Sequence, residues 1–342
     1  MPGCVLYHIL AENHCLCLQL RFERTCLDVS IVIVNWNVEG LLKLCLRSIY
    51  QSLSDAAFEW EVIVVDNASE DGSLQMVARE FPGVKLVANQ SNLGFTKANN
   101  QGMALASGRY VLLLNPDTEL TRGALATMLE YMEASRDVAA LGPQLLFADG
   151  TVQSSRRRFP TFLTGFIEST VLQRFFPEHS LLKRYYVLDR SNDEVQEVNW
   201  VVGACMLVRR EAIDEVGVFD EQFFMYSEEL DWCFRMEKAG WKIVYLPLAR
   251  VLHYEARSSE QNVLGRNIHF HDSKCKFFSK HHGAWKGMVL RMFIVLTLVF
   301  QVVEDGLKLI LVVRNRRMRK QRMAMLTKAA GWHLVHIVGG RR

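Results

Sequence analysis

Short apolar runs alternate along this chain with longer stretches of mixed polarity. The run from Val29 to Val34 is almost entirely apolar, which is typical of a strand covered on both faces, and residues 39–52 follow it as a predicted helix. The same alternation predicts strands at 61–65, 84–87, 110–114 and 138–146, and helices at 69–81, 97–106 and 122–134. Strands and helices that alternate at this spacing predict an α/β fold with a mostly parallel, doubly wound sheet.

The pattern weakens between Asp149 and Glu197 and returns with the apolar run 198–208, which is predicted as a strand. Gly203 indicates a break in this strand, where the backbone approaches a ligand or another strand closely. A short helix is expected at 210–216. A further helix is expected at 228–239, with Ser227 as its N-cap, and a strand at 241–246.

The chain changes character from residue 284 onward. Residues 292–303 are apolar, 304–306 interrupt the run, 307–313 are again mostly apolar, and a dense basic run follows at 314–322. The first apolar run is shorter than the ~20 residues of a transmembrane helix. The pattern therefore favours two amphipathic helices in the membrane interface, with the arginines on anionic headgroups. A hairpin packed on the domain itself and a single spanning helix are the alternatives.

Composition limits the classes of partner and the cellular compartment that fit this chain. The 342 residues carry a net charge of +3, which is too small to indicate a nucleic-acid partner. None of the eight cysteines belongs to a CxxC pair, so buried free thiols in a reducing compartment are expected. We predict a poorly specified extension at 1–27, which lacks the features of a signal peptide, a catalytic domain at 28–283 and a membrane-associating tail at 284–342.

Polar side chains end each of the first four predicted strands, at one edge of the sheet. They are Asn35, Asp66, Asn89 with Asn92, and Asp117. No G-x-G-x-x-G or GxxxxGK[ST] motif occurs, so a nucleotide would be held by side chains. Asp66 can accept hydrogen bonds from a base or a ribose. Asn35, Asn67 and Asn99 can both donate and accept them, although each is also a common turn or cap residue.

Asp117 is the first candidate for metal binding. It closes the segment Asn115-Pro116-Asp117 directly after a buried strand, and an acid at that rim can hold a metal ion against a phosphate. The alternative is a plain turn, because Asn, Pro and Asp all favour turns. His253, shortly after a later strand, could add a nitrogen ligand to the same metal, or be structural.

A second acidic cluster begins the helix predicted at 228–239. Glu228, Glu229 and Asp231 lie at its N-terminus, where the helix dipole favours carboxylates, and Asp231 can pair with Arg235. These effects leave the two adjacent glutamates unexplained. A carboxylate near a nucleotide-sugar could act as a general base on an incoming hydroxyl, so Glu229 or Glu228 is the candidate base.

Residues 28–253 resemble, in order, the inverting glycosyltransferases of family two with the GT-A fold, and most of all their bacterial rhamnosyltransferase-like subgroup. The motifs that carry the resemblance are VSIVIVNWN, VIVVDNASEDGS, NLGFTKANNQG, YVLLLNPDT, GPQLL, QSSRRRFPT, WVVGACMLVRRE, VGVFDEQFFMYSEELDWCFR and GWKIVYLP. The resemblance implies a Rossmann-like, mostly parallel sheet flanked by helices.

The resemblance also implies roles for individual residues. Asp117 stands at the last acid of the DxD motif for a divalent metal, Mg²⁺ or Mn²⁺, and Asn115 replaces the first acid. The catalytic ED motif falls on Glu228 and Glu229, so the implied base is a glutamate in place of the usual aspartate. Asp66 would contact the nucleotide base, and His253 would complete the metal site. The other substrate-binding positions implied are Gly94, Asn115, Trp200, Gly203 and Asp231, with Trp200 and Gly203 lining the sugar and acceptor pocket.

The implied activity is a single in-line displacement that inverts the anomeric carbon. The donor is a nucleotide-diphosphate sugar, with dTDP-rhamnose expected, and the acceptor is a hydroxyl of a lipid-linked saccharide in cell-surface polysaccharide synthesis. The enzyme would lie on the cytoplasmic face of the inner membrane as a peripheral or monotopic protein. The alternatives are another donor such as UDP-galactose or UDP-N-acetylglucosamine, an inactive nucleotide-sugar-binding protein, and a pyrophosphorylase-like enzyme.

Overall fold

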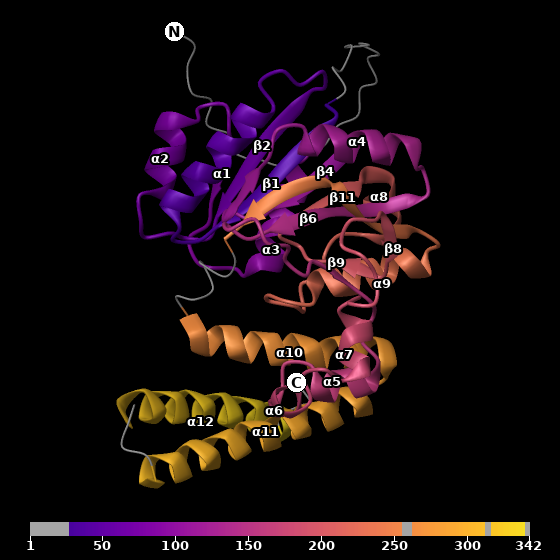
Figure 1. Ribbon diagram of the computed structural model, residues 1–342. Coiled ribbons are helices and arrows are strands. Elements are labelled where there is room, and N and C mark those ends of the chain that lie inside the picture. Colours follow the sequence, from indigo (N-terminus) through magenta and orange to yellow (C-terminus); the bar gives the residue numbers. More distant parts are fainter. Residues whose placement is uncertain (1–26, 255–261, 312–315, 339–342) are drawn as a thin grey trace, which may run out of the picture.

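The computed structural model describes residues 27–254, 262–311 and 316–338, in an α/β body with a layer of long helices against one end (Figure 1). The strands are β1 (Val29–Asn35), β2 (Trp60–Asp66), β3 (Lys85–Ala88), β4 (Tyr110–Leu114), β5 (Thr118–Leu120), β6 (Val138–Leu146), β7 (Arg156–Arg157), β8 (Gln196–Val198), β9 (Trp200–Val201), β10 (Cys205–Arg209) and β11 (Lys242–His253). The helices are α1 (Glu39–Ser52), α2 (Ser73–Glu80), α3 (Phe95–Leu105), α4 (Ala124–Ala134), α5 (Phe162–Ile167), α6 (Val171–Phe175), α7 (Ser180–Tyr185), α8 (Arg210–Val216), α9 (Glu228–Lys238), α10 (Val263–His282), α11 (Ala284–Leu311) and α12 (Arg316–Val338).

A nine-stranded sheet forms the centre of the body, in the order β3-β2-β1-β4-β10-β6-β11-β5, with β8 pairing to β11. Strands β1 to β4 are mutually parallel, and β6 and β11 run the same way. Strands β10, β5 and β8 run against their neighbours. The predicted mostly parallel α/β sheet is therefore confirmed, and the carboxyl ends of β1, β2 and β4 meet at one edge.

Both faces of the sheet are covered, which explains the continuous apolar runs. Along β1, Ile31 and Ile33 belong to the core beneath α1, α2 and α4, whereas Val32 and Val34 belong to the core on the other face, with residues of α3, α8 and α9. All seven residues of β1 are buried. A parallel strand that is buried on both faces cannot alternate in polarity, as the sequence indicated.

The apolar run 198–208 is not one strand, contrary to the prediction. Its first part, β8, pairs with β11; the chain then leaves the main sheet at Asn199, pairs as β9 with β7, and returns as β10 beside β4. The Asn199 side chain fixes the departure by accepting from the Phe159 N–H and donating to Glu237. The resulting bend at Gly203 brings the backbone to the start of α9.

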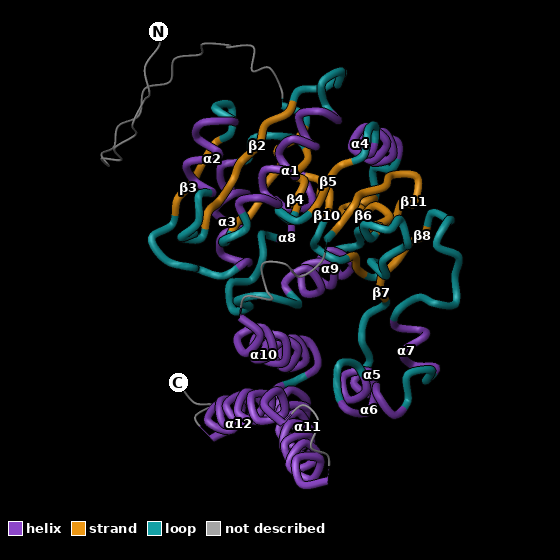
Figure 2. The backbone as a smooth tube through the Cα atoms, turned by 60° about the vertical axis from the view of Figure 1, so that its left-hand side comes forward, coloured by secondary structure: helices purple, strands orange, loops and turns teal. Residues whose placement is uncertain are grey.

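The acidic interruption at 304–306 does not break the tail helix, which also corrects the sequence-based prediction. Helix α11 runs through it for 28 residues, because each acid has a basic partner: Glu304 pairs with Arg174 and Lys308, and buried Asp305 pairs with Arg319 and Arg322 of α12. Gly287 lets α10 approach closely, since a Cβ there would lie 2.6 Å from the Cys275 carbonyl oxygen. Helices α10, α11 and α12 thus pack against one another, with α10 nearest the sheet (Figure 2).

Two further predictions bear on the fold. The predicted free thiols are found at Cys45, Cys205, Cys233 and Cys275, all of them buried, and the other four cysteines lie outside the described residues. Among the described helices, α11 alone is long and apolar enough to cross a membrane by length and composition, with a mean hydropathy of 1.9.

Candidate active site

The polar residues at the carboxyl ends of β1, β2 and β3 form one hydrogen-bonded network. Asn35 Nδ2 donates to Asp66 Oδ2 at 2.8 Å, and the Ser69 N–H donates to Asp66 Oδ1 at 2.8 Å. Asn67 Oδ1 accepts from Asn89 at 2.9 Å. The structure therefore brings Asn35, Asp66 and Asn67 together as predicted. Asn35 Oδ1 is buried and has no hydrogen-bond partner among the described residues, so the network retains an acceptor for a ligand.

Gly94 and Asn99 support this network from the start of α3. Asn67 Nδ2 donates to the Gly94 carbonyl at 3.1 Å, and buried Asn99 donates to the Phe95 carbonyl at 2.9 Å. Gly94 has φ +89°, and a Cβ there would lie 2.7 Å from Phe224. Only glycine fits this position without strain. Gly94 therefore shapes the loop through its backbone, and Asn99 uses its Nδ2 group to bond the first turn of α3.

Asp117 and His253 lie side by side, where β5 pairs with β11. His253 Nε2 is 3.4 Å from Asp117 Oδ1, and both side chains are buried. Gln153 clamps the histidine: its amide nitrogen donates to the His253 carbonyl at 2.6 Å, and its amide oxygen faces Nδ1 at 2.9 Å. An oxygen facing Nδ1 puts the ring proton there and leaves the lone pair on Nε2, the arrangement of a metal-ligating histidine. Nε2 has no hydrogen-bond partner among the described residues.

Backbone contacts connect this pair to the start of α9. The Asn115 N–H donates to the Ala204 carbonyl at 2.8 Å, and the backbone N–H of the neighbouring Gly203 lies near the Glu229 carboxylate and lowers its pKa. The Asn115 amide oxygen is buried without a hydrogen-bond partner in the described part of the chain. Gly203 lies close to Glu229, since a Cβ on Gly203 would be 3.8 Å from the Glu229 Cβ, an ordinary contact distance. The end of β4 and the first turn of α9 thus belong to one site.

Helix α9 begins on strained backbone. Tyr226 and Ser227 both have positive φ, 69° and 63°, which non-glycine residues rarely adopt. Ser227 occupies the N-cap position as predicted, but its side chain makes no cap hydrogen bond, because a left-handed residue does not aim its hydroxyl at the helix N–H groups. Two such residues cost of order 1–3 kcal/mol each, and strain of this kind is concentrated at functional sites.

The two glutamates that follow are buried and coupled. Burial, and then the charge of Glu229, raise the pKa of Glu228 well above the usual value. Burial also raises the pKa of Glu229, but hydrogen bonds from backbone N–H groups, including that of Gly203, and from Glu228 oppose the rise. Glu228 therefore holds its proton more strongly, and Glu229 is the member of the pair that ionises first as the pH rises. An ionised carboxylate is what a general base needs.

Two predicted substrate-binding residues have other partners. Asp231 is fully buried and is engaged by Arg235 at 2.9 Å and by Lys280 and His281 at 2.7 Å. Burial would raise its pKa, but hydrogen bonds from His281, Lys280 and Arg235 lower it to about 2. Asp231 therefore anchors α10 to α9 and does not face a substrate. The Trp200 indole donates to the Arg158 carbonyl at 3.1 Å, and its ring faces Arg157.

Sequence reasoning missed Gln153 and Arg157. Gln153 follows a weakly patterned loop, and its role depends on His253, 100 positions away. Arg157 lies within electrostatic reach of Glu229. The run Arg156-Arg157-Arg158 was the available signal, but the sequence does not distinguish the three arginines.

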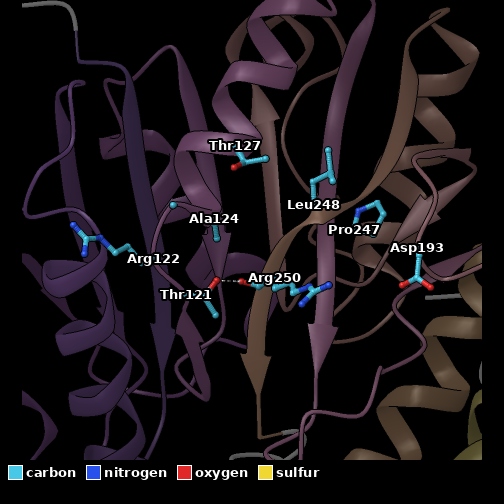
Figure 3. Close-up of a pocket in the computed structure, with 9 residues that line it drawn as sticks. Thr121, Arg122, Ala124, Thr127, Asp193, Pro247, Leu248 and Arg250 are labelled. Atoms are coloured by element: carbon cyan, nitrogen blue, oxygen red, sulfur yellow. Dashed lines mark hydrogen bonds between the residues drawn. The ribbon is translucent and has the colours of Figure 1, made fainter.

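A separate cavity of about 380 Å³ opens further along the β5–β11 pair. Figure 3 shows its lining from the start of α4, from β11 and from Asp193, with Thr121 donating to the Arg250 carbonyl at 2.7 Å. No predicted site residue lines it. The cavity is therefore distinct from the site at the ends of β1, β2 and β4.

Comparison with known proteins agrees with this geometry. The sequence profile of the family described as "Glycosyl transferase family 2" matches residues 30–217. The chain is 34% identical over 241 residues to the N-acetylglucosaminyl-diphospho-decaprenol L-rhamnosyltransferase of Mycobacterium tuberculosis, covering 67% of this chain and 78% of the relative. It is 30% identical over 239 residues to the rhamnosyltransferase WbbL of Escherichia coli, covering 66% and 83%.

A solved structure shares the fold. The mannosyltransferase PcManGT of Pyrobaculum calidifontis, in complex with GDP-Man and Mn²⁺, superposes with a TM-score of 0.53 at 17% identity, over 93% of this chain and 88% of that one. The profile match over more than half of the chain, together with relatives at 30–34% identity, shows that this protein is a glycosyltransferase that belongs to glycosyl transferase family 2.

Proposed function

We propose that the protein transfers a sugar, with inversion, from a nucleotide-diphosphate donor to a hydroxyl of a lipid-linked saccharide. The observation that carries this proposal is the placement of two acidic sites at one sheet edge. The Asp117–His253 pair lies just beyond β4 and at the end of β11, and the Asn115–Ala204 hydrogen bond links this region to Gly203, which contacts Glu229. One site suits the leaving diphosphate and the other suits the attacking hydroxyl.

Asp117 and His253 would hold a divalent cation, Mg²⁺ or Mn²⁺. The buried Nε2 without a hydrogen-bond partner and the adjacent carboxylate fit such an ion, with Gln153 orienting the imidazole. No group of three or more His, Cys, Asp or Glu residues suited to a metal occurs in the described ranges. Two protein ligands leave coordination positions for phosphate oxygens. The bound ion would neutralise charge that develops on the leaving nucleotide diphosphate.

Glu229 would take the proton from the acceptor hydroxyl as that oxygen attacks the anomeric carbon. Glu229 is buried beside the Gly203 backbone and Glu228, so its longer side chain has a restricted position. Because attack and departure occur on opposite sides of the anomeric carbon, its configuration inverts. Asn35, Asp66 and Asn67 would receive the nucleoside.

The relatives suggest the substrates. One relative is named as acting on an N-acetylglucosaminyl diphosphate on decaprenol with L-rhamnose, and the other is also named as a rhamnosyltransferase. We therefore propose dTDP-rhamnose as the donor, with UDP-galactose and UDP-N-acetylglucosamine as the alternatives, and a polyprenyl-diphosphate saccharide as the acceptor.

A donor panel tests this proposal. The purified full chain is incubated with Mn²⁺, a synthetic polyprenyl-diphospho-N-acetylglucosamine and each donor in turn, and the product is identified by mass and by anomeric coupling in NMR. We expect transfer from dTDP-rhamnose with inverted configuration. Transfer from a UDP-sugar alone would reassign the donor, and retained configuration would overturn the mechanism.

We also propose that residues 28–283 form the catalytic domain and that the tail at 284–342 attaches it to the cytoplasmic face of the membrane. Helix α11 exposes an apolar stripe along its length, which we name the α11 stripe. Its members are Trp285, Met288, Val289, Met292, Leu296, Val299, Phe300, Val303, Leu307, Ile310 and Leu311. Exposed Arg316, Arg317 and Lys320 begin α12 nearby and suit anionic headgroups.

The packing of α11 favours a helix that lies in the interface. Its other face is buried against α5, α10 and α12, and includes Leu290, Ile294 and Leu298. A spanning α11 would carry α12, with Asp305 and its two arginine partners, into hydrocarbon at a cost of several kcal/mol. The hairpin packing and the membrane-facing stripe therefore coexist on opposite faces of the same helix.

Substituting Leu296, Val303 and Ile310 together with glutamate will reduce binding to anionic vesicles. These side chains are 66%, 55% and 77% exposed, so the change removes apolar surface and adds repulsion with little effect on packing. Vesicle flotation measures the bound fraction. Leu248→Glu, on a 71% exposed leucine of β11, is the control and should float like the wild type. Undiminished flotation of the triple variant would disprove the interfacial stripe.

A further inference from the structure

The three consecutive arginines before α5 have different surroundings. Arg156 is buried, and its guanidinium donates to Gln196, to Asn192 and to backbone carbonyls, including those of Arg190 and Ser191. Arg158 makes a double contact with Asp189, at 2.8 and 2.9 Å. The guanidinium groups of Arg156 and Arg158 therefore already have hydrogen-bond acceptors within the fold. Arg157 has no carboxylate partner among the described residues.

Aromatic side chains, rather than an ion pair, hold the Arg157 side chain in place. Its guanidinium lies over the Tyr186 ring at 4.6 Å and near the Trp200 ring at 5.9 Å. Nη1 donates to Ser154 Oγ at 2.8 Å and to the Arg156 carbonyl at 2.9 Å. These bonds use two of the five N–H donors of an arginine. The N–H donors on Nε and Nη2 have no acceptor within the described ranges. Stacking on Tyr186 and Trp200 orients the plane of the guanidinium and therefore these donors.

Neighbouring carboxylates are already engaged. Glu168 is buried and pairs with Lys274 while accepting a hydrogen bond from Ser169. Glu229 is the proposed base. Burial lowers the pKa of the Arg157 guanidinium, although the side chain is only half-buried. A partly buried cation with free donors is suited to an anionic ligand.

The position of Arg157 indicates which anion this is. Strand β7 pairs with β9, which leads directly to Gly203 and the base, so Arg157 lies near Glu229. On its other side, the chain continues into α5 to α7, which lie between the sheet and α11 (Figure 1). Phe166 of α5 packs on Phe293 of α11 at 4.9 Å, and Arg174 of α6 pairs with Glu304. Arg157 thus lies between the base and the helices that carry the α11 stripe.

We propose that Arg157 binds the diphosphate of the lipid-linked acceptor. This inference rests on the proposed function and adds a specificity-determining residue to it. The donor diphosphate belongs at Asp117 and His253, so a second anion site beside the base serves the second substrate. When a hydroxyl of the acceptor sugar contacts Glu229, the diphosphate on its anomeric carbon extends toward the lipid. We expect this diphosphate to pass Arg157. A planar guanidinium with free parallel donors suits a phosphate.

The test compares Arg157→Gln with the wild type on two acceptors. One acceptor is an alkyl-diphospho-N-acetylglucosamine, and the other is the alkyl glycoside of the same sugar without phosphate. We expect KM for the diphosphate acceptor to rise ~10- to 100-fold, the range for losing charged hydrogen bonds. KM for dTDP-rhamnose and the rate with the alkyl glycoside should stay within about twofold.

Two controls keep the outcomes distinct. Arg190→Gln removes an equal charge from an exposed position in the same region and should leave both KM values unchanged. Arg157→Lys keeps the positive charge but lacks the planar set of N–H donors. Its KM for the diphosphate acceptor should fall between those of Arg157→Gln and the wild type. Melting temperatures check that each variant folds. A rise in the donor KM, or an equal loss on both acceptors, would overturn the assignment. Absence of transfer by the wild type with every donor would instead reject the proposed function.

Discussion

Replacing Glu229 with glutamine will lower the rate of sugar transfer by ~10²- to 10⁴-fold, the usual contribution of a general base. The amide keeps the size of the side chain and can still contact the Gly203 backbone region, so the fold and donor binding should persist. Transfer is measured by product formation at saturating substrates, and donor binding by calorimetry with the unreactive nucleotide diphosphate. A variant with full activity would remove Glu229 from the mechanism.

The neighbouring variant Glu228→Gln provides the matched control. Because Glu228 holds the proton of the pair, a neutral amide that still donates to Glu229 mimics its working state. Transfer should therefore fall far less than in Glu229→Gln. Since burial raises the pKa of Glu229, the wild-type kcat/KM should decline as pH falls through a value above that of an ordinary glutamate, and Glu228→Gln should keep this acid limb. A dead Glu228→Gln beside an active Glu229→Gln would reverse the two roles.

Replacing Asp117 with alanine will reduce transfer by roughly 10³-fold, because a metal contributes several kcal/mol to stabilising the leaving group. The variant leaves His253 as the one remaining member of the pair. Mn²⁺ binding in the presence of the nucleotide diphosphate, followed by electron paramagnetic resonance, should weaken in parallel. Asp55→Ala removes a carboxylate that is 75% exposed and pairs with Arg122, and it is expected to behave like the wild type.

Unchanged Mn²⁺ affinity with lost transfer would place Asp117 in positioning rather than in metal binding. Full transfer by Asp117→Ala would show that the site works without the carboxylate and would reduce the segment Asn115-Pro116-Asp117 to a turn.

The sequence allowed the sheet and its polar edge to be predicted because both depend on local pattern. A strand buried on both faces must be apolar throughout, so its end is visible where the first polar residues appear, as at Asp66 and Asp117. The carboxyl ends of parallel strands meet at one edge, and this alone brought Asn35 and Asp66 together in the prediction. The family motifs supplied the roles of Glu228 and Glu229.

The remaining features depend on contacts between distant parts of the chain. Asp231 has the sequence setting of an active-site acid, but its lysine and histidine partners come from α10, about 50 positions later. Arg156 and Arg157 are neighbours with the same chemistry, but Arg156 is enclosed by backbone carbonyls, whereas Arg157 stacks on the rings of Tyr186 and Trp200. The apolar run 198–208 was predicted as a single strand because its residues are apolar on both sides of Asn199. The change of pairing partner there, from β11 to β7, does not alter the hydrophobic pattern.

Asp231 also limits how this enzyme can be divided or recombined. It lies two positions after Glu229 on α9, and two of its three side-chain partners, Lys280 and His281, belong to α10, which packs against α11 and α12. A chimaera that grafted another enzyme's tail before α10 would leave a buried carboxylate with one partner. The chain up to α9 and the helices from α10 onward are therefore not interchangeable. A working chimaera should take α9 and α10 from the same parent enzyme.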